Sequence, residues 1–135
     1  MAELATVLFV CVHNAGRSQM AAGYLRHLAG GEIKVLSAGT DPGAAINKVA
    51  VEVMLEEGID LSEATPEKLS DEKVLESDYV ITMGCGDACP YFPGKTYLDW
   101  PLTDPKDQPI EVVRQIRNEI RSKVEALIAE VRANA

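Results

Sequence analysis

The sequence predicts an α/β fold of three layers, in which a central parallel sheet of four strands lies between helices on both faces. Three observations lead to this prediction. Apolar runs of strand length alternate with helix-like stretches along the chain, which is typical of a parallel sheet. A length of 135 residues suits one domain, residues 1–135, with an ordinary hydrophobic core. No internal repeat, linker or low-complexity stretch interrupts the alternation.

The first half of the chain contains two expected strands and two expected helices. The Val- and Phe-rich residues 6–11 predict the first strand, and the Ala-, Leu- and Met-rich residues 17–29 predict the helix that follows. Residues 32–37, "EIKVLS", predict a second strand. A second helix is expected over residues 47–57, where Gly58 provides a stop signal.

The second half predicts a short helix over residues 70–75, a strand over residues 79–83 and a short strand over residues 96–98. The final helix, residues 110–131, has the clearest pattern. Its apolar residues recur at steps of three or four and mark one face for the core: Ile110, Val113, Ile116, Ile120, Val124, Leu127 and Val131. The charges of this helix, Glu119 and Lys123 included, are expected to form a solvated face.

Composition excludes several classes of partner. The chain has 13 basic and 21 acidic residues, a net charge of -8, which argues against nucleic acids and anionic membranes. No apolar stretch has the length of a membrane span or the form of a signal peptide, so a cytoplasmic protein is expected. Its three cysteines should then be reduced at rest rather than paired in structural disulfides. Their odd number in a small chain indicates a chemical role for the thiols.

The segment "CVHNAGRS", residues 11–18, has the composition of an anion-binding loop. Cys11 falls at the carboxyl end of the first strand, where ligands bind in parallel sheets. Small residues let the loop backbone approach a ligand, and the positive end of the following helix adds to its attraction for anions. Arg17 contributes a charged fork that matches two oxygens of a tetrahedral anion. The residues expected to bind the oxyanion are Val12, His13, Asn14, Ala15, Gly16, Arg17 and Ser18.

The same donors would stabilise a thiolate, which predicts that Cys11 is a nucleophile. Ser18 is expected to hydrogen-bond the sulfur, and Asn14 to brace the loop from inside. His13 is given no catalytic role. The alternative is a buried structural cysteine with an unrelated arginine nearby. Asn, Gly and Ser residues within a strand–loop–helix context favour the functional interpretation.

The segments "CVHNAGRS" and "LTDP" resemble the nucleophile loop and the Asp-Pro general-acid loop of the low-molecular-weight tyrosine phosphatase fold, and the resemblance covers essentially the whole chain. Within that fold, "SQMAAGY", "SAGT", "GID", "TMGCGDACP" and "DWPLTDP" resemble the arsenate reductases. This resemblance implies reduction of arsenate to arsenite, with no bound organic cofactor or metal. It also implies an external reductant, either thioredoxin or a mycothiol–mycoredoxin system, and a monomer is expected.

The resemblance further implies a role for each cysteine. Cys11 would attack arsenate while Asp104 protonates the departing oxygen. Cys85 would then attack Cys11, releasing arsenite and forming a Cys11–Cys85 disulfide. Cys89 would attack Cys85, leaving a Cys85–Cys89 disulfide for the external reductant.

Several alternatives stay open at this point. Cys85 and Cys89 could bind zinc, or could be inert thiols while an external thiol resolves the adduct on Cys11. Asp104 could be an ordinary turn residue, with Asp99 as the acid instead. The same scaffold could serve a phosphatase acting on phosphotyrosine or other aryl phosphates. A non-catalytic oxyanion or redox sensor is the rival from a different functional class.

Overall fold

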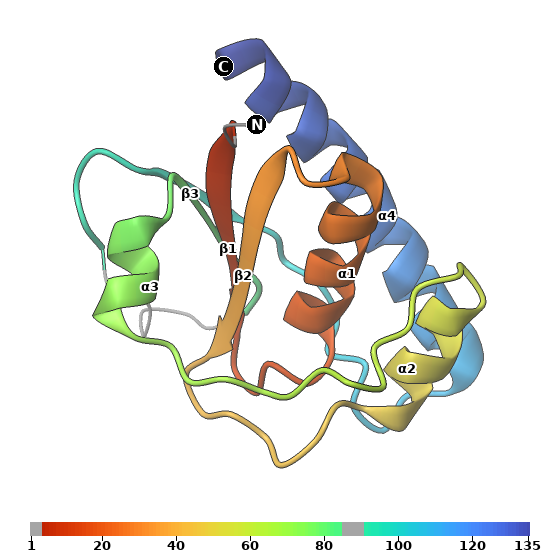
Figure 1. Ribbon diagram of the computed structural model, residues 1–135. Helices are drawn as coiled ribbons and strands as arrows, with labels where there is room; N and C mark the ends of the chain where they lie inside the picture. The colour runs from red at the N-terminus through yellow and green to blue at the C-terminus, as the bar shows by residue number, and fades with distance from the viewer. Residues whose placement is uncertain (1–3, 85–90) are drawn as a thin grey trace.

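The computed structural model describes residues 4–84 and 91–135. Within these ranges the chain forms a parallel sheet with strand order β2-β1-β3-β4, and helices pack on both faces (Figure 1). This confirms the predicted three-layer α/β architecture. The elements are β1 (Ala5–Cys11), α1 (Arg17–Ala29), β2 (Ile33–Gly39), α2 (Lys48–Leu55), α3 (Asp71–Glu76), β3 (Tyr79–Thr82), β4 (Thr96–Asp99) and α4 (Ile110–Asn134).

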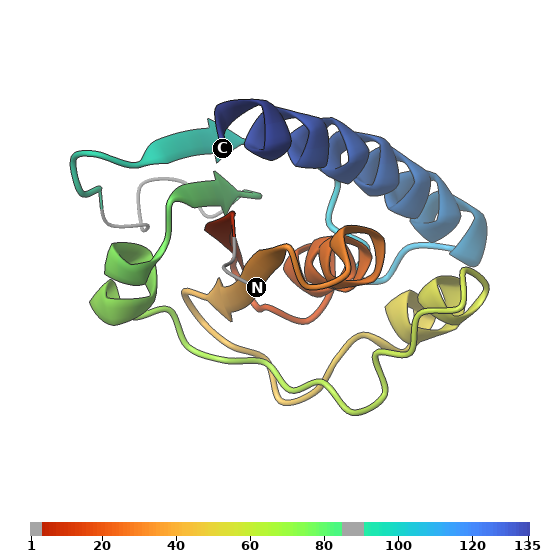
Figure 2. The same ribbon diagram turned by 45° about the horizontal axis from the view of Figure 1, so that its top comes forward.

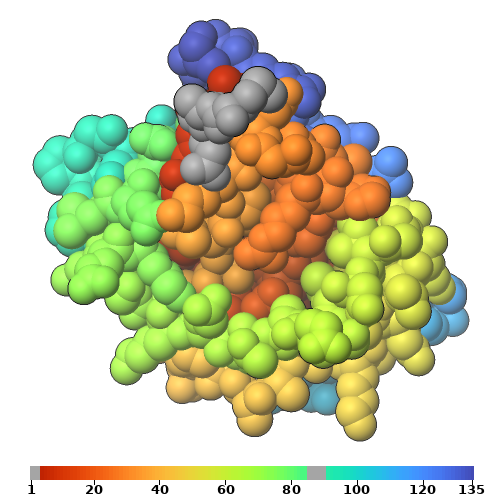
Figure 3. Space-filling view, viewed as in Figure 1, coloured from red at the N-terminus to blue at the C-terminus, as the bar shows by residue number. Residues whose placement is uncertain are grey.

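The two faces of the sheet have separate hydrophobic cores, because successive side chains of a strand point to opposite sides. Val7 and Phe9 of β1 belong to the larger core, which they share with α1, α2 and α4. Leu8 and Val10 belong to the smaller core, where Val74 of α3 covers them. All four β1 side chains are fully buried. Figures 1 and 2 show α3 on one side of the sheet and α1 and α4 on the other. In the space-filling view of Figure 3, the segment between α2 and α3 crosses the lower part of the face.

The ends of the elements differ only slightly from the sequence predictions. β2 continues past residue 37, because Ala38 and Gly39 extend its pairing with Val10 and Cys11 of β1. α4 continues to Asn134, three residues beyond its last predicted apolar position. This extension of β2 carries its end to the level of Cys11.

Side-chain caps set the starts of the two short helices. Asn47 lies outside α2, and its Oδ1 accepts hydrogen bonds from the backbone N–H groups of Val49 and Ala50 at 2.9 and 3.0 Å. Ser70 caps α3 by accepting from the backbone N–H of Lys73 at 3.3 Å. These side-chain oxygens satisfy N–H groups that have no partner inside the helix.

α4 is amphipathic, as its spacing predicts, and packs on α1 and α2. Ile116, Ile120 and Val124 are among its buried residues, whereas Ile110 at its start is only partly buried. Among the helices that the structure describes, none combines the length and the apolar character needed to cross a membrane.

The strand order places the end of β1 at a switch point of the sheet. β2 lies on one side of β1 and β3 on the other, so the chain leaves β1 in one direction and later returns in the opposite one. Connections diverge above such a strand and leave a crevice there. Cys11 is the last residue of β1 and therefore lies at this crevice.

Candidate active site

The Cys11 sulfur is buried and receives hydrogen bonds from the loop that follows it. The backbone N–H of Asn14 donates to Cys11 Sγ at 3.2 Å, and the Ser18 hydroxyl lies 2.9 Å from the same sulfur. Cys11 is 2% exposed. Both contacts come from residues 11–18, as predicted.

The orientation of the Asn14 amide determines which way the Ser18 hydroxyl points. The backbone N–H of Glu67 can only donate, and it donates to Asn14 Oδ1 at 2.9 Å. Asn14 Nδ2 therefore faces Ser18 and donates to its oxygen at 2.7 Å. The hydroxyl proton of Ser18 is then free to point at the Cys11 sulfur. This leaves the sulfur accepting hydrogen bonds, the role that a thiolate fills better than a thiol.

Asn14 itself is held by a buried network. It is fully buried with a positive φ of 50°, a backbone conformation that Asn tolerates better than most residues. Gln19 Nε2 donates to Asn14 Oδ1 at 3.1 Å and to the carbonyl of Thr65 at 3.3 Å. The sequence analysis identified the bracing role of Asn14 but missed Gln19 and residues 65–67, whose backbone groups carry no signature in residue type.

A second segment, residues 40–47, orients the loop backbone. Its amides donate to the outward-facing carbonyls of the loop. In a trans peptide the C=O and the following N–H point in opposite directions. The next amides along the loop therefore turn inward, as that of Asn14 does toward Cys11. The donors are Thr40, Asp41, Gly43 and Asn47, which reach the carbonyls of Cys11, Val12, His13 and Ala15 at 3.2, 2.8, 2.9 and 2.8 Å.

Gly39, at the end of β2, permits this close contact. A Cβ atom at Gly39 would lie 2.6 Å from the carbonyl oxygen of Val12 and 2.9 Å from the amide nitrogen of Asn14. Neither backbone atom can give way without moving the loop. The "SAGT" segment, residues 37–40, thus packs directly against the backbone of the oxyanion loop, residues 11–18. The sequence analysis did not assign it this role.

Arg17 places a permanent positive charge beside the loop. Its side chain is 9% exposed, and its Nη2 lies 3.6 Å from a carboxylate oxygen of Asp104. Its Nη1 donates to the carbonyl of Leu102 at 3.2 Å. These contacts hold the guanidinium between the first residues of α1 and the segment that precedes α4.

Asp104 and Pro105 dock on the loop from the opposite end of the chain. A Cβ atom at Gly16 would lie 2.7 Å from Pro105 Cγ, so only glycine leaves room for this contact. The Asp104 side chain is 48% exposed and faces the same space as Arg17. Asp99, the other acid considered, accepts a hydrogen bond from Thr82 Oγ1 at 2.8 Å and belongs to β4.

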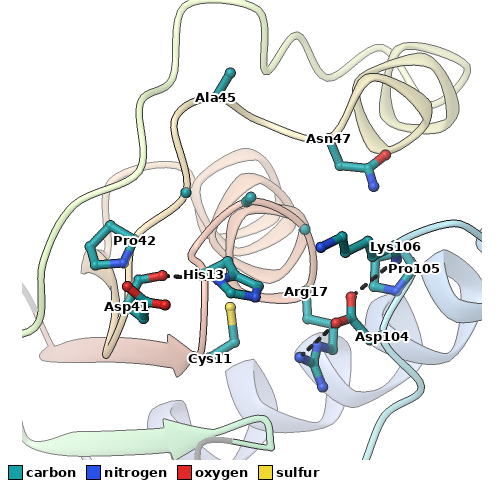
Figure 4. A pocket seen from close by; sticks show the side chains of 13 residues that line it. Cys11, His13, Arg17, Asp41, Pro42, Ala45, Asn47, Asp104, Pro105 and Lys106 are labelled. Carbon is teal, nitrogen blue, oxygen red and sulfur yellow. Dashed lines mark hydrogen bonds and ion pairs between the residues drawn. The ribbon is translucent and has the colours of Figure 1, made fainter.

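These groups surround one cavity of about 430 Å³ (Figure 4). Cys11 lies at its floor, with Arg17 and Asp104 on one side and Asp41 and Pro42 on the other, while Ala45 and Asn47 lie at the far rim from Cys11. His13 stands beside the sulfur, and its Nδ1 is hydrogen-bonded to the carbonyl oxygen of Asp41 at 2.9 Å. The described residues that line the cavity are Cys11, His13, Ala15, Gly16, Arg17, Asp41, Pro42, Gly43, Ala45, Asn47, Asp104, Pro105 and Lys106.

The structure thus brings together three of the five predicted catalytic residues: Cys11, Arg17 and Asp104. Cys85 and Cys89 lie outside the described residues, so the predicted relay stays a prediction. Within residues 4–84 and 91–135, no group of three or more His, Cys, Asp or Glu side chains is placed to hold a metal ion.

The arrangement of a buried thiol under inward-facing amides and an arginine suits nucleophilic attack on a tetrahedral oxyanion. A model of the family described as low molecular weight phosphotyrosine protein phosphatase matches residues 6–135. The chain belongs to this family.

Within the family, the chain is similar to arsenate reductases. A putative arsenate reductase of Halobacterium salinarum is 40% identical over 127 residues, which cover 90% of this chain and 89% of the relative. The glutaredoxin arsenate reductase of Synechocystis is 37% identical over 128 residues, covering 93% and 97% of the two chains.

A solved structure agrees with this grouping. The thioredoxin-dependent arsenate reductase of Corynebacterium glutamicum superposes with a TM-score of 0.88 at 42% identity. The match covers 99% of this chain, which spans 65% of the length of that protein. The comparisons confirm both the phosphatase-like fold and the arsenate reductase resemblance that the sequence motifs indicate.

Proposed function

We propose that this protein reduces arsenate to arsenite with Cys11 as the nucleophile. One observation supports this most directly. The Cys11 sulfur accepts hydrogen bonds at the floor of a cavity whose wall carries the guanidinium of Arg17. Arsenate is a tetrahedral oxyanion close to phosphate in charge and shape, so a site whose loop amides and arginine bind phosphate can also bind arsenate. The kinship with arsenate reductases supports arsenic as the element that is reduced.

In the first step the Cys11 thiolate attacks arsenic. An arsenic–sulfur bond forms as an arsenic–oxygen bond breaks, and the departing oxygen takes a proton from Asp104. The inward-facing loop amides and Arg17 hold the remaining oxygens. No oxidation state changes in this step, so two electrons must still be supplied.

In the second step a second thiolate, assigned to Cys85, attacks Cys11 Sγ. A disulfide forms and the sulfur–arsenic bond breaks. Its electron pair passes to arsenic, which becomes arsenite. Cys89 then exchanges with the disulfide, freeing Cys11 and leaving Cys85–Cys89 oxidised. The roles of Cys85 and Cys89 are supported by the motif "TMGCGDACP".

An external dithiol must then reduce the Cys85–Cys89 disulfide to close the cycle. We propose a thioredoxin-type reductant, because the C. glutamicum protein that this chain resembles is thioredoxin-dependent. A mycothiol–mycoredoxin couple is the second reductant to test. We also propose a monomeric cytoplasmic enzyme of one domain, in keeping with the need for reduced thiols and with a family match over residues 6–135.

The family description itself favours a second candidate, a phosphatase. The residues that the structure describes around the cavity include no Phe, Tyr or Trp side chain to stack against a phosphotyrosine ring. The same nucleophile and cradle would serve hydrolysis of a small phosphate ester, with water in place of the second thiol.

A disulfide map separates these functions. The fully reduced protein is mixed with one equivalent of arsenate, or of phosphate as control, then alkylated, digested and read by mass spectrometry. We expect a Cys85–Cys89 disulfide that appears only with arsenate, and arsenite in equal amount. A Cys89→Ser variant should stop at Cys11–Cys85, whereas Cys11→Ser should form no arsenate-dependent disulfide.

Other outcomes assign the other functions. Three alkylated cysteines together with turnover of an aryl phosphate would indicate a phosphatase. One round of oxidation without turnover in the presence of thioredoxin and its reductase would indicate a sensor.

A further inference from the structure

Gly84 lies directly against the guanidinium of Arg17. A Cβ atom at Gly84 would lie 2.7 Å from Arg17 Nη1, 3.6 Å from Cζ and 3.8 Å from Nη2. The first distance is far inside van der Waals contact. The φ of Gly84 is +86°, in the region that residues with a side chain rarely adopt. Two separate features therefore require glycine here: backbone conformation and the space that Arg17 occupies.

Both sides of this contact are held in place. The backbone N–H of Met83 donates to the carbonyl of Val10 at 2.8 Å, which fixes the end of β3 beside β1. Arg17 is buried and is held by the Leu102 carbonyl and Asp104. The three described atoms nearest to a side chain at position 84 all belong to the Arg17 guanidinium, and none of them is backbone. Such a substitution would therefore displace the guanidinium before it disturbed the fold.

We propose that Gly84 is a positioning residue for oxyanion binding. Because Gly84 has no side chain, the Arg17 guanidinium has room to lie against it and stays at the cavity with Cys11. The proposal deepens the proposed function and rests on its oxyanion site. Gly84 need not touch the oxyanion itself, because its effect passes through Arg17.

The chain contains a matched control for the backbone conformation. Gly94 has a φ of +88°, almost that of Gly84, and among residues 4–84 and 91–135 a Cβ atom there would have no neighbour within 4 Å. Gly94→Ala therefore introduces the same left-handed strain without contacting any group that the structure describes. A difference between Gly84→Ala and Gly94→Ala reports the contact with Arg17.

The test measures the affinity of the reduced protein for inorganic phosphate by calorimetry, and its KM and kcat for arsenate. Urea unfolding shows that each variant folds. We expect both variants to lose similar stability. Phosphate affinity should fall about tenfold or more in Gly84→Ala, the size expected for a charge-assisted hydrogen bond. It should be unchanged in Gly94→Ala. KM for arsenate should rise in Gly84→Ala by a larger factor than kcat falls.

A double-substitution cycle checks that the effect passes through Arg17. In an Arg17→Lys background the clashing Nη1 atom is absent, and an ammonium at the position of Cζ would lie 3.6 Å from a Cβ atom at position 84, an ordinary van der Waals contact. Gly84→Ala should then cause little further loss of phosphate affinity. An equal loss in both backgrounds would overturn the proposal, as would wild-type affinity in the Gly84→Ala protein.

The remaining outcomes also decide the matter. A Gly84→Ala protein that does not fold beside a folded Gly94→Ala protein would make Gly84 a structural residue and refute the positioning role. A wild-type protein that binds neither phosphate nor arsenate would refute it as well. Phosphate binding that depends on Gly84, in a protein that does not reduce arsenate, would support the positioning role and refute the proposed function.

Discussion

At the scale of single residues, the direction of the Ser18 hydroxyl proton determines whether the Cys11 sulfur accepts a hydrogen bond from Ser18. The amide of Asn14 donates to Ser18, which turns the Ser18 hydroxyl toward the Cys11 sulfur. Residues 65–67 fix that direction, because the N–H of Glu67 occupies the Asn14 oxygen. The hydrogen bonding of the Cys11 sulfur therefore depends on a backbone amide that is distant in the chain.

Ser18→Ala tests this chain of hydrogen bonds. Removing the hydroxyl leaves the sulfur one donor short and Asn14 Nδ2 without its partner. We expect alkylation of Cys11 by iodoacetamide at pH 7 to slow about tenfold, and stability to fall by about 1–3 kcal/mol. The rate is followed by mass spectrometry under reducing conditions.

Ser77→Ala is the matched control for this substitution. Ser77 is also buried, and it donates to the carbonyl of Lys73 at 2.6 Å, away from the cavity. It should lower stability without slowing alkylation. An unchanged rate in Ser18→Ala would mean that the hydroxyl does not support the nucleophile.

Residue types alone identified part of this site. Cys11, Arg17, Asn14 and Ser18 could be predicted because each contributes a distinctive side-chain group within eight positions. The close approach of Gly84 to Arg17 could not be predicted, since it joins two residues that are 67 positions apart in the chain.

At the scale of elements, a cluster of charges joins α2 to α4. Glu56, at the end of α2, accepts hydrogen bonds from Arg114 Nη2 at 2.7 Å and Arg117 Nη1 at 2.6 Å. Arg117 is buried and also donates to the carbonyl of Val53 at 2.9 Å. Arg121 pairs with Glu57 at 2.8 Å. The expectation that the charges of α4 form a solvated face is therefore wrong for Arg117.

This cluster makes part of the stability dependent on pH. Hydrogen bonds from Arg114, and then from Arg117, lower the pKa of Glu56 from 4.5 to about 2. The unfolded chain binds this proton more readily than the folded one. The stabilisation is therefore fully present above about pH 4.5 and is lost as the pH falls through about 2.

Glu56→Gln, which does not titrate, should be less thermally stable than wild type at pH 6. The difference should shrink steadily below pH 4.5. Melting temperatures across this range measure it, with Glu119→Gln on the exposed side of α4 as control. A gap that stays constant down to pH 2 would contradict the assignment.

Element starts were predicted to within one residue where a residue type marks them. Helices were expected to begin at residues 47 and 70, and Asn47 and Ser70 instead cap α2 and α3. The second helix was expected to reach residue 57 because of Gly58, but α2 ends at Leu55. The extension of β2 through Gly39 was missed, because it depends on pairing with β1 rather than on β2 itself.

At the scale of the whole molecule, α4 covers the larger core and begins five residues after Pro105 of the segment that contacts Arg17. Ile120 lies fully buried near the middle of this helix. Ile120→Ala should lower the free energy of unfolding by about 2–5 kcal/mol, because it leaves a cavity. Ile120→Val should cost about 0.5–1.5 kcal/mol.

Urea unfolding measures both variants. The phosphate affinity of the folded protein should stay at the wild-type value, since Ile120 does not line the cavity. A loss of affinity without a loss of stability would show that α4 acts on the site other than by holding the fold together.

The sequence by itself determined the order of strands and helices, the position of Cys11 at the end of β1, and the family to which the chain belongs. Periodicity and residue type are local properties, so they can be read one segment at a time. Only the tertiary structure decided how residues 40–47 turn the loop amides inward, how Gly16 receives Pro105 and how Gly84 makes room for Arg17. Backbone hydrogen-bonding groups are alike in nearly every residue, and close approach is a relation between distant segments. Neither can be recognised from residue types, because both depend on which distant segments the fold brings together.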